Sequence, residues 1–165
     1  MNLTMLILYV LLSVVNLDCF HTQPVTTELS GTLSLNAMNN HQVLTGTFDG
    51  SSNEMIVWAN GEIVTRVTQF YESYGVLINN NGAAAGLGSN GISQDDRLII
   101  ANAFGEFDVV ATITGSAGWS SLTAINEQGS VVGNYSAGSG SSDWQAFLWT
   151  EKSGVQFVEP TAETT

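Results

Sequence analysis

The sequence predicts an all-β fold made of repeated four-stranded antiparallel units, with about three units along its 165 residues. The chain contains 17 glycines and frequent Asn, Ser and Thr, which favour turns and disfavour helix. Its apolar segments are short, rich in β-branched and aromatic residues, and bounded by turn residues, which is typical of strands. One turn motif also recurs at a spacing typical of repeat proteins. The length allows one ordinary domain or a short array of repeats.

The recurring motif is an apolar residue, an Asn, two polar residues, Gly or Gln, three mostly apolar residues and a Gly. Its copies occupy residues 38–46, 78–86 and 125–133, so that successive copies are offset by 40 and 47 residues. Because Asn and Gly tolerate the positive φ of tight reversals, each copy predicts a turn between two strands. The first copy carries Gln42 where the other two carry glycine.

Each copy continues into a second predicted hairpin. The predicted strand pairs are 55–58 with 62–66, 98–101 with 106–111, and 146–150 with 155–158. Four strands in 40 to 47 residues is the period of a propeller blade, so we expect a β-propeller-like domain. The domain would span 32–160, with repeats at about 32–70, 71–114 and 115–160. A solenoid of stacked hairpins is the closest alternative. Trp58 and Trp149 occupy corresponding positions and are predicted to lie in the core.

The third copy resembles the HAF repeat of bacterial extracellular repeat proteins in two segments, AINEQGSVVG at 124–133 and AFLWT at 146–150. The second copy keeps the INNNG turn at 78–82 but lacks the aromatic strand, and Gln145 stands where the histidine that names the family would be. The resemblance implies an exported protein of β-propeller-like blades. It implies no reaction, because the family has no general catalytic assignment.

Three units are too few for a closed propeller, which typically has four to eight blades. We therefore expect a partial or open array that self-associates through its open sheet edges, rather than a closed monomer. One such arrangement pairs two chains into a six-bladed ring. The alternatives are that the chain is a truncated fragment of a longer propeller protein or a small open sheet capped at its ends.

Residues 1–20 are predicted to be a signal peptide or another N-terminal hydrophobic segment. The apolar run at 3–15 has the length of a secretory h-region and is shorter than the roughly 20 residues that span a bilayer. The alternatives are a retained anchor, a buried N-terminal strand and a lipid attached at Cys19. A polar linker follows at 21–31, and 161–165 form a tail. The expected location is secreted or cell-surface.

The charge of the chain restricts its partners. Lys and Arg number 3 against 15 Asp and Glu, which gives a formal net charge of -12. Phosphate backbones and anionic headgroups are bound by extended positive surfaces, so nucleic acids and anionic membrane surfaces are poor partners. The remaining candidates are a protein, a glycan or a second copy of the chain.

Candidate ligand-binding residues lie in the predicted loops. Trp119 and Trp144 have no counterparts in the other repeats and lie in Gly/Ser-rich loops. A ring there can stack on a sugar, anchor a protein partner or fold back over the sheet edge. Asp95, Asp96 and Asp143 follow the second strand of their repeats, as do Asp49 and Glu54 in the first repeat, which predicts an acidic rim. Alternatively, these charges only keep loops and edges soluble.

The sequence predicts no catalytic residue and no cofactor. His41 occupies the motif slot of Asn81 and Gln128, which indicates a polar turn residue. Calcium is chemically allowed at 49–54, where Asp49 and Glu54 lie, and at Asp95 and Asp96, although neither string has the ligand spacing of a known calcium loop. We therefore expect an exported, non-enzymatic β-repeat module that binds or scaffolds protein or glycan. The alternative is a carboxylate-based extracellular glycan hydrolase, because two suitably spaced carboxylates can cleave a glycoside.

Overall fold

Strands account for the regular structure of the residues that the structure describes. The structure is a computed structural model that describes residues 31–91, 95–113, 120–136 and 144–158. Over these residues it contains strands, turns and no helix, which confirms the all-β prediction. The strands in these ranges are β1 (Thr32–Met38), β2 (Leu44–Asp49), β3 (Asn53–Ala59), β4 (Glu62–Val67), β5 (Glu72–Ile78), β6 (Ala84–Ser89), β7 (Asp96–Ala101), β8 (Phe107–Ile113), β9 (Ser120–Ile125), β10 (Val131–Ser136), β11 (Trp144–Thr150) and β12 (Gly154–Val158).

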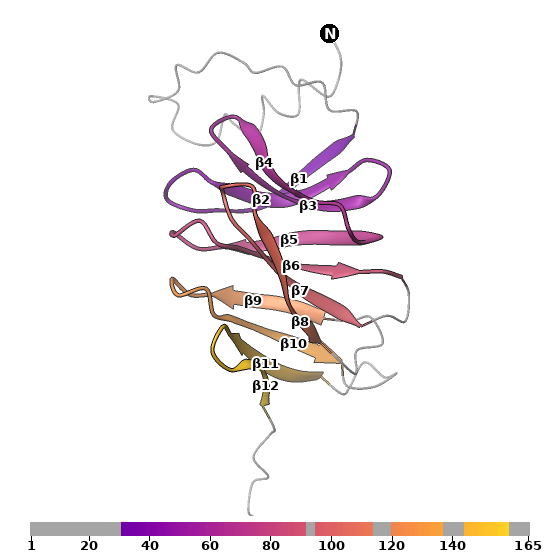
Figure 1. Cartoon of the computed structure of the whole chain (residues 1–165), viewed down its shortest axis with the longest axis vertical. Coiled ribbons are helices and arrows are strands. Elements are labelled where there is room, and N and C mark those ends of the chain that lie inside the picture. The colour runs from indigo at the N-terminus through magenta and orange to yellow at the C-terminus, as the bar shows by residue number, and fades with distance from the viewer. Residues whose placement is uncertain (1–30, 92–94, 114–119, 137–143, 159–165) are drawn as a thin grey trace, which may run out of the picture.

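The strands form successive antiparallel meanders, which we call the first (β1–β4), second (β5–β8) and third (β9–β12) meander. A single parallel pair, Asn53 with Glu72, joins β3 to β5, so the first two meanders belong to one sheet. The third is a separate sheet in the order β12-β11-β10-β9. The meanders are layered along the long axis of the molecule (Figure 1). The prediction of antiparallel sheets is confirmed, and the described strands close no barrel or propeller ring.

Each first hairpin turns at the asparagine of the repeated motif. Asn126 Oδ1 accepts the backbone N–H groups of Gln128 at 3.0 Å and Ser130 at 2.9 Å. Oδ1 of Asn39 and of Asn79 likewise accepts the N–H four residues further on, at 3.0 and 2.9 Å. The side-chain oxygen therefore closes the same reversal in all three meanders, which is why asparagine recurs there.

The residue three positions after each of these asparagines is in the left-handed region. Its φ is +82° at Gly82, +81° at Gly129 and +62° at Gln42. Glycine adopts this conformation without a steric cost, whereas the Cβ atom of Gln42 makes it unfavourable. The first turn thus has the shape of the other two with a less suitable residue.

The same asparagines join the meanders to one another. Asn39 Nδ2 donates to the backbone carbonyl of Asn79 at 2.9 Å, and Asn79 Nδ2 donates to that of Asn126 at 2.8 Å. The two acceptors lie 40 and 47 residues ahead, which are the offsets of the motif copies. Both donors are buried residues, so water does not compete for the bonds. We call this row the asparagine ladder.

Close backbone approach fixes the spacing of the first and second meanders. A Cβ atom on Gly75 in β5 would lie 2.7 Å from the carbonyl oxygen of Gly46 in β2 and would clash with the Thr45 hydroxyl. Only glycine fits at position 75. Asn36, in the bulge of β1, donates from Nδ2 to the carbonyl of Gly75 at 2.7 Å. Strands β5 and β9 carry a bulge at the corresponding position, so all three meanders share this irregularity.

Two hydrophobic clusters fill the spaces between the meanders. The cluster between the first and second has the buried members Met55, Val57, Val67, Phe70, Ala84, Ile99 and Ala101. The cluster between the second and third has Ala85, Leu98, Ile113, Leu122, Val131, Tyr135, Phe147 and Trp149. Trp149 is therefore a core residue, as predicted, whereas Trp58 is only partly buried and belongs to neither cluster. The second meander packs on both faces and is the centre of the stack.

Replacing Asn79 by Asp should destabilise the protein strongly. The change keeps the Oδ1 acceptor of the turn but converts the ladder donor into an acceptor that faces the carbonyl of Asn126. The lost hydrogen bond and the buried carboxylate together should lower the unfolding free energy by about 2 to 4 kcal/mol at neutral pH. Asn126→Asp is the matched control, because this exposed side chain donates to no described residue, and its cost should stay below about 1 kcal/mol. Urea unfolding measures both, and equal losses would contradict the ladder.

Replacing Gln42 by Gly should stabilise the protein. Glycine relieves the strain of the positive φ but also has a greater entropy in the unfolded chain. The net gain in the free energy of unfolding should be about 0.5 to 1 kcal/mol. The reverse change, Gly129→Gln, should cost a similar amount, because a Cβ there has nothing within 4 Å and the penalty is one of backbone conformation alone. Thermal unfolding followed by circular dichroism tests the pair. A loss of stability in Gln42→Gly would show that the side chain makes a compensating contact.

Candidate functional site

A surface hollow lies where the first meander meets the second. It has a volume of about 190 Å³ and is lined by Asp49, Ser51, Ser52, Asn53, Tyr71 and Glu72. Asp49 ends β2, Asn53 begins β3, and the two serines lie in the turn between them, whereas Tyr71 precedes β5 and Glu72 is its first residue. The parallel pair of Asn53 with Glu72 brings the two segments together. We call this site the Tyr71 hollow.

Polar groups surround an exposed aromatic ring in this hollow. Tyr71 is 68% exposed, and Asp49 is exposed as well. The Tyr74 hydroxyl donates to the Glu72 carboxylate at 2.8 Å and accepts the Asn53 side-chain amide at 3.1 Å. Burial raises the pKa of the Tyr74 hydroxyl, and the hydrogen bond to Glu72 raises it further, so the hydroxyl keeps its proton and remains the donor of this bond. These contacts fix one wall of the hollow and leave Tyr71 and Asp49 free to meet a ligand.

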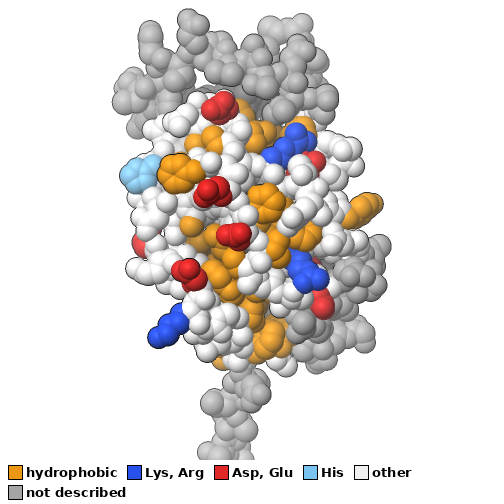
Figure 2. Space-filling model, in the orientation of Figure 1, with side chains coloured by type: hydrophobic (Ala, Val, Ile, Leu, Met, Phe, Trp, Pro, Cys, Tyr) orange, Lys and Arg blue, Asp and Glu red, His pale blue; other side chains and the backbone are white. Residues whose placement is uncertain are grey.

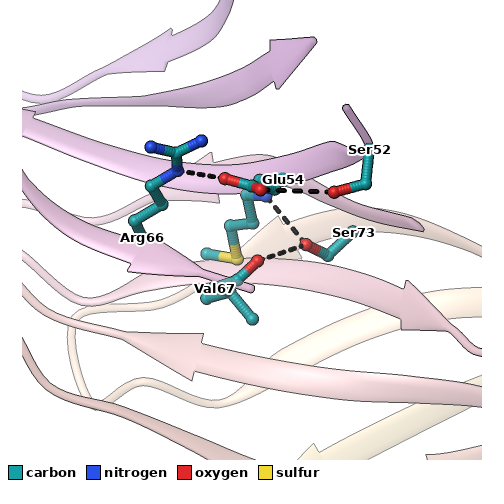
Figure 3. Close-up of polar contacts among 6 residues, drawn as sticks. Ser52, Glu54, Arg66, Val67 and Ser73 are labelled. Atoms are coloured by element: carbon teal, nitrogen blue, oxygen red, sulfur yellow. Dashed lines mark hydrogen bonds and ion pairs between the residues drawn. The ribbon is translucent and has the colours of Figure 1, made fainter. Parts of the chain in front are cut away.

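An ion pair between the buried Glu54 and the exposed Arg66 lies next to the hollow (Figure 3). The Glu54 carboxylate accepts hydrogen bonds from Arg66 Nε and, at 3.2 Å, from Ser52 Oγ. The Arg66 guanidinium also lies 4.7 Å from the centre of the Phe48 ring. Ser73 accepts the backbone N–H of Met55 at 2.8 Å and donates to the Val67 carbonyl at 3.1 Å, which ties β5 to β3 and β4. Glu54 therefore serves the structure and is not presented to solvent.

The Glu54–Arg66 ion pair argues against the calcium site considered at residues 49–54. Calcium binding needs several convergent oxygen ligands, and Glu54 is already engaged by Arg66 and Ser52. Within the described ranges, no group of three or more His, Cys, Asp or Glu side chains is placed to hold a metal ion. The hollow thus presents two carboxylates, Asp49 and Glu72, without an assembled metal centre.

The acidic pair of the second repeat lies at the start of β7. Asp96 is buried and Asp95 is partly buried. Burial raises the pKa of the Asp96 carboxyl, the neighbouring Ser120 lowers it, and the Asp95 charge raises it. Asp96 therefore lies beside Ser120 at the start of β9, in the third meander, and is not part of a solvated rim.

The other sequence-predicted residues are divided between two regions. Trp144 is 46% exposed at the start of β11, in the third meander, and does not line the Tyr71 hollow. Trp119 and Asp143 lie outside the described residues. His41 is an exposed turn residue whose backbone N–H donates to Asn39 Oδ1 at 2.9 Å.

Sequence reasoning missed Tyr71 and Glu72. Both lie in the link between two repeats, outside the recurring motif, and the repeat comparison gives such links no position. The signal in the sequence was a polar turn in which an aromatic residue, Tyr71, stands beside a carboxylate, Glu72. Its proximity to the 49–53 turn depends on the pairing of β3 with β5, which is not readable from either segment alone.

Comparison with protein-family models, with curated proteins and with solved structures finds no match for this chain. In the part of the chain that the structure describes, no helix has the length and apolar character needed to cross a membrane.

Replacing Asp96 by Asn should stabilise the protein at neutral pH. Because burial raises the pKa of Asp96 in the folded state, the native protein holds this proton more tightly than the unfolded chain does. Wild-type stability from this group is therefore fully present below the unfolded-state pKa of about 4 and is lost as pH rises through the folded-state pKa. Asn carries no such charge, so the advantage of the variant should grow from about pH 4 to about pH 7.

Urea unfolding of both proteins at the two pH values measures this difference. An advantage of the same size at both pH values would show that the effect of Asp96→Asn is one of packing or hydrogen bonding and not of ionisation. A destabilised variant at neutral pH would contradict the assignment of a costly buried charge.

Proposed function

We propose that the chain is an exported, non-enzymatic β-repeat module that binds glycan at the Tyr71 hollow. The observation that carries the proposal is an exposed Tyr71 ring placed beside two carboxylates, an amide and hydroxyl groups in one depression. A sugar presents an apolar C–H face and a rim of hydroxyl groups. The Tyr71 ring suits the face, and Asp49, Glu72 and Asn53 suit the hydroxyl groups.

Charge and size narrow the class of glycan. The formal net charge of -12 and the carboxylates of the hollow repel acidic polysaccharides, which favours neutral or amino sugars. A hollow of about 190 Å³ is smaller than the roughly 300 to 1,000 Å³ typical of enclosed ligand sites. It suits contact with one part of a long chain rather than capture of a whole small molecule.

The proposal includes the architecture that the HAF-like motifs imply. Each meander has the four antiparallel strands of a propeller blade, and the three together would be a partial, open propeller of a secreted or cell-surface protein. The apolar run at 3–15 supports export. A protein partner is the alternative to a glycan, and open sheet edges would support self-association.

One observation favours the hydrolase as a second candidate. A buried carboxyl with a raised pKa, such as Asp96, has the character of a general acid at moderate pH. Cleavage of polysaccharide by the purified protein, if it is lost in a folded Asp96→Asn variant, would favour the enzyme over the binding module. The absence of cleavage by the wild type would exclude the hydrolase.

Replacing Tyr71 by Ala should weaken binding to neutral polysaccharide by about 10-fold, because the stacking surface is lost while the carboxylates remain. Affinity electrophoresis against neutral, amino and acidic polysaccharides measures the effect. Phe104→Ala is the matched control, since Phe104 is an 86% exposed aromatic residue outside the hollow. Equal weakening by both substitutions, or binding to no polysaccharide, would contradict the proposal.

A further inference from the structure

The third meander leaves open a sheet face that the first two meanders bury. Val132 in β10 occupies the motif position of Thr45 in β2 and of Ala85 in β6. Thr45 and Ala85 are 0% exposed, because the following meander covers them, whereas Val132 is 38% exposed. The same surface is therefore an interface twice within the chain and is uncovered the third time.

The strand register places further apolar side chains on the Val132 side of the third meander. Leu148 lies opposite Val132, and Ala146 and Trp144 follow at alternate positions of β11. In β12, Val158 lies opposite Ala146 of β11. Trp144 and Val158 are 46% and 55% exposed. We call these five residues the terminal face. Figure 2 shows hydrophobic side chains reaching the lower end of the stack, where Figure 1 places β11 and β12.

The asparagine ladder ends on the same side. Asn39 and Asn79 are buried and each donates from Nδ2 to the following meander. Asn126 is exposed, and its Nδ2 donates to none of the described residues. The terminal face thus combines an apolar surface with a hydrogen-bond donor at its rim, as the two internal interfaces do.

Charge is absent from the strands that form this face. Strands β9 to β12 contain no Asp, Glu, Lys or Arg. In a chain of net charge -12, this makes the third meander the place where two copies meet with least repulsion.

The opposite end of the stack is unsuited to receive the terminal face. On the outer side of the first meander, the strand pairing sets Glu54 opposite Phe48 and Arg66 opposite Ile56. The Glu54–Arg66 ion pair lies there, and covering it with an apolar sheet would remove charges from water at a high cost. Ile56 already has no exposed surface. Head-to-tail stacking of copies is therefore disfavoured.

We infer that the terminal face is the interface of a two-fold symmetric dimer, in which the third meanders of two copies pack face to face. A two-fold axis lets one self-complementary patch serve both copies and closes the assembly at two. The inference goes beyond the proposed glycan site and does not depend on it. It uses a sheet face, as the internal stack does, and not the sheet edges.

Sedimentation velocity of the full chain, in the form the expressing cell yields, tests the dimer between about 1 and 100 µM. The wild type should sediment at twice the monomer mass. Val132→Glu should weaken dimerisation by about 30-fold or more, because each copy would bury an unpaired charge. Val109→Glu is the matched control, since Val109 is 41% exposed in β8, away from the terminal face. It should leave the dimer intact.

Ala146→Glu places the charge on the neighbouring strand of the same face, so the test survives if Val132→Glu fails to fold by circular dichroism. A monomeric wild type over the whole range, a dimer retained by the folded variants, or open-ended growth of the assembly would each overturn the inference. Polysaccharide binding by Val132→Glu separates the two proposals. Loss of the dimer with binding retained supports the terminal face independently of the Tyr71 hollow, and a dimer without any glycan binding would remove the proposed ligand alone.

Discussion

A buried asparagine has to satisfy both an acceptor and two donor hydrogens, and the stack is organised around how Asn39 and Asn79 do this. In each, Oδ1 closes the turn of its own hairpin while Nδ2 reaches the backbone of the next meander. One side chain thus couples local and tertiary structure. Because a buried polar group left unpaired costs about 1 to 3 kcal/mol, the turn cannot shift its register without also breaking the contact between meanders.

The backbone contacts of the interfaces make this coupling strict. At Gly75 the second meander touches the backbone of the first, so the two sheets cannot slide past each other without a clash or a gap. The faces that meet between the meanders are buried against each other, so the stability of each meander depends on its own strands and on its interfaces with its neighbours. The second meander, covered on both sides, gains two such interfaces, and the third gains one.

The recurring motif made it possible to predict the local structure, that is, the positions of the strands and turns. Strands and turns could be located because Asn and Gly mark reversals and because β-branched and aromatic residues fill the strands between them. The pattern could not predict how one unit sits on the next, since that depends on the ladder and on the approach at Gly75. The missing information on packing between units also explains why the sequence did not identify the site residues correctly. Asp96 resembles a solvated loop residue until β9 covers it, and Tyr71 gains polar neighbours only through the pairing of β3 with β5.

The distribution of charge along the stack separates two kinds of surface. The Tyr71 hollow, with Asp49 and Glu72, lies between the first two meanders, whereas the strands of the third are uncharged. A dimer formed through the terminal face would therefore leave both hollows uncovered, one on each copy. Two weak sites held at a fixed separation bind a long polymer more tightly than either alone, provided that the polymer can span them. Because a shallow hollow offers little affinity by itself, a repetitive glycan is the ligand that would gain most from this arrangement.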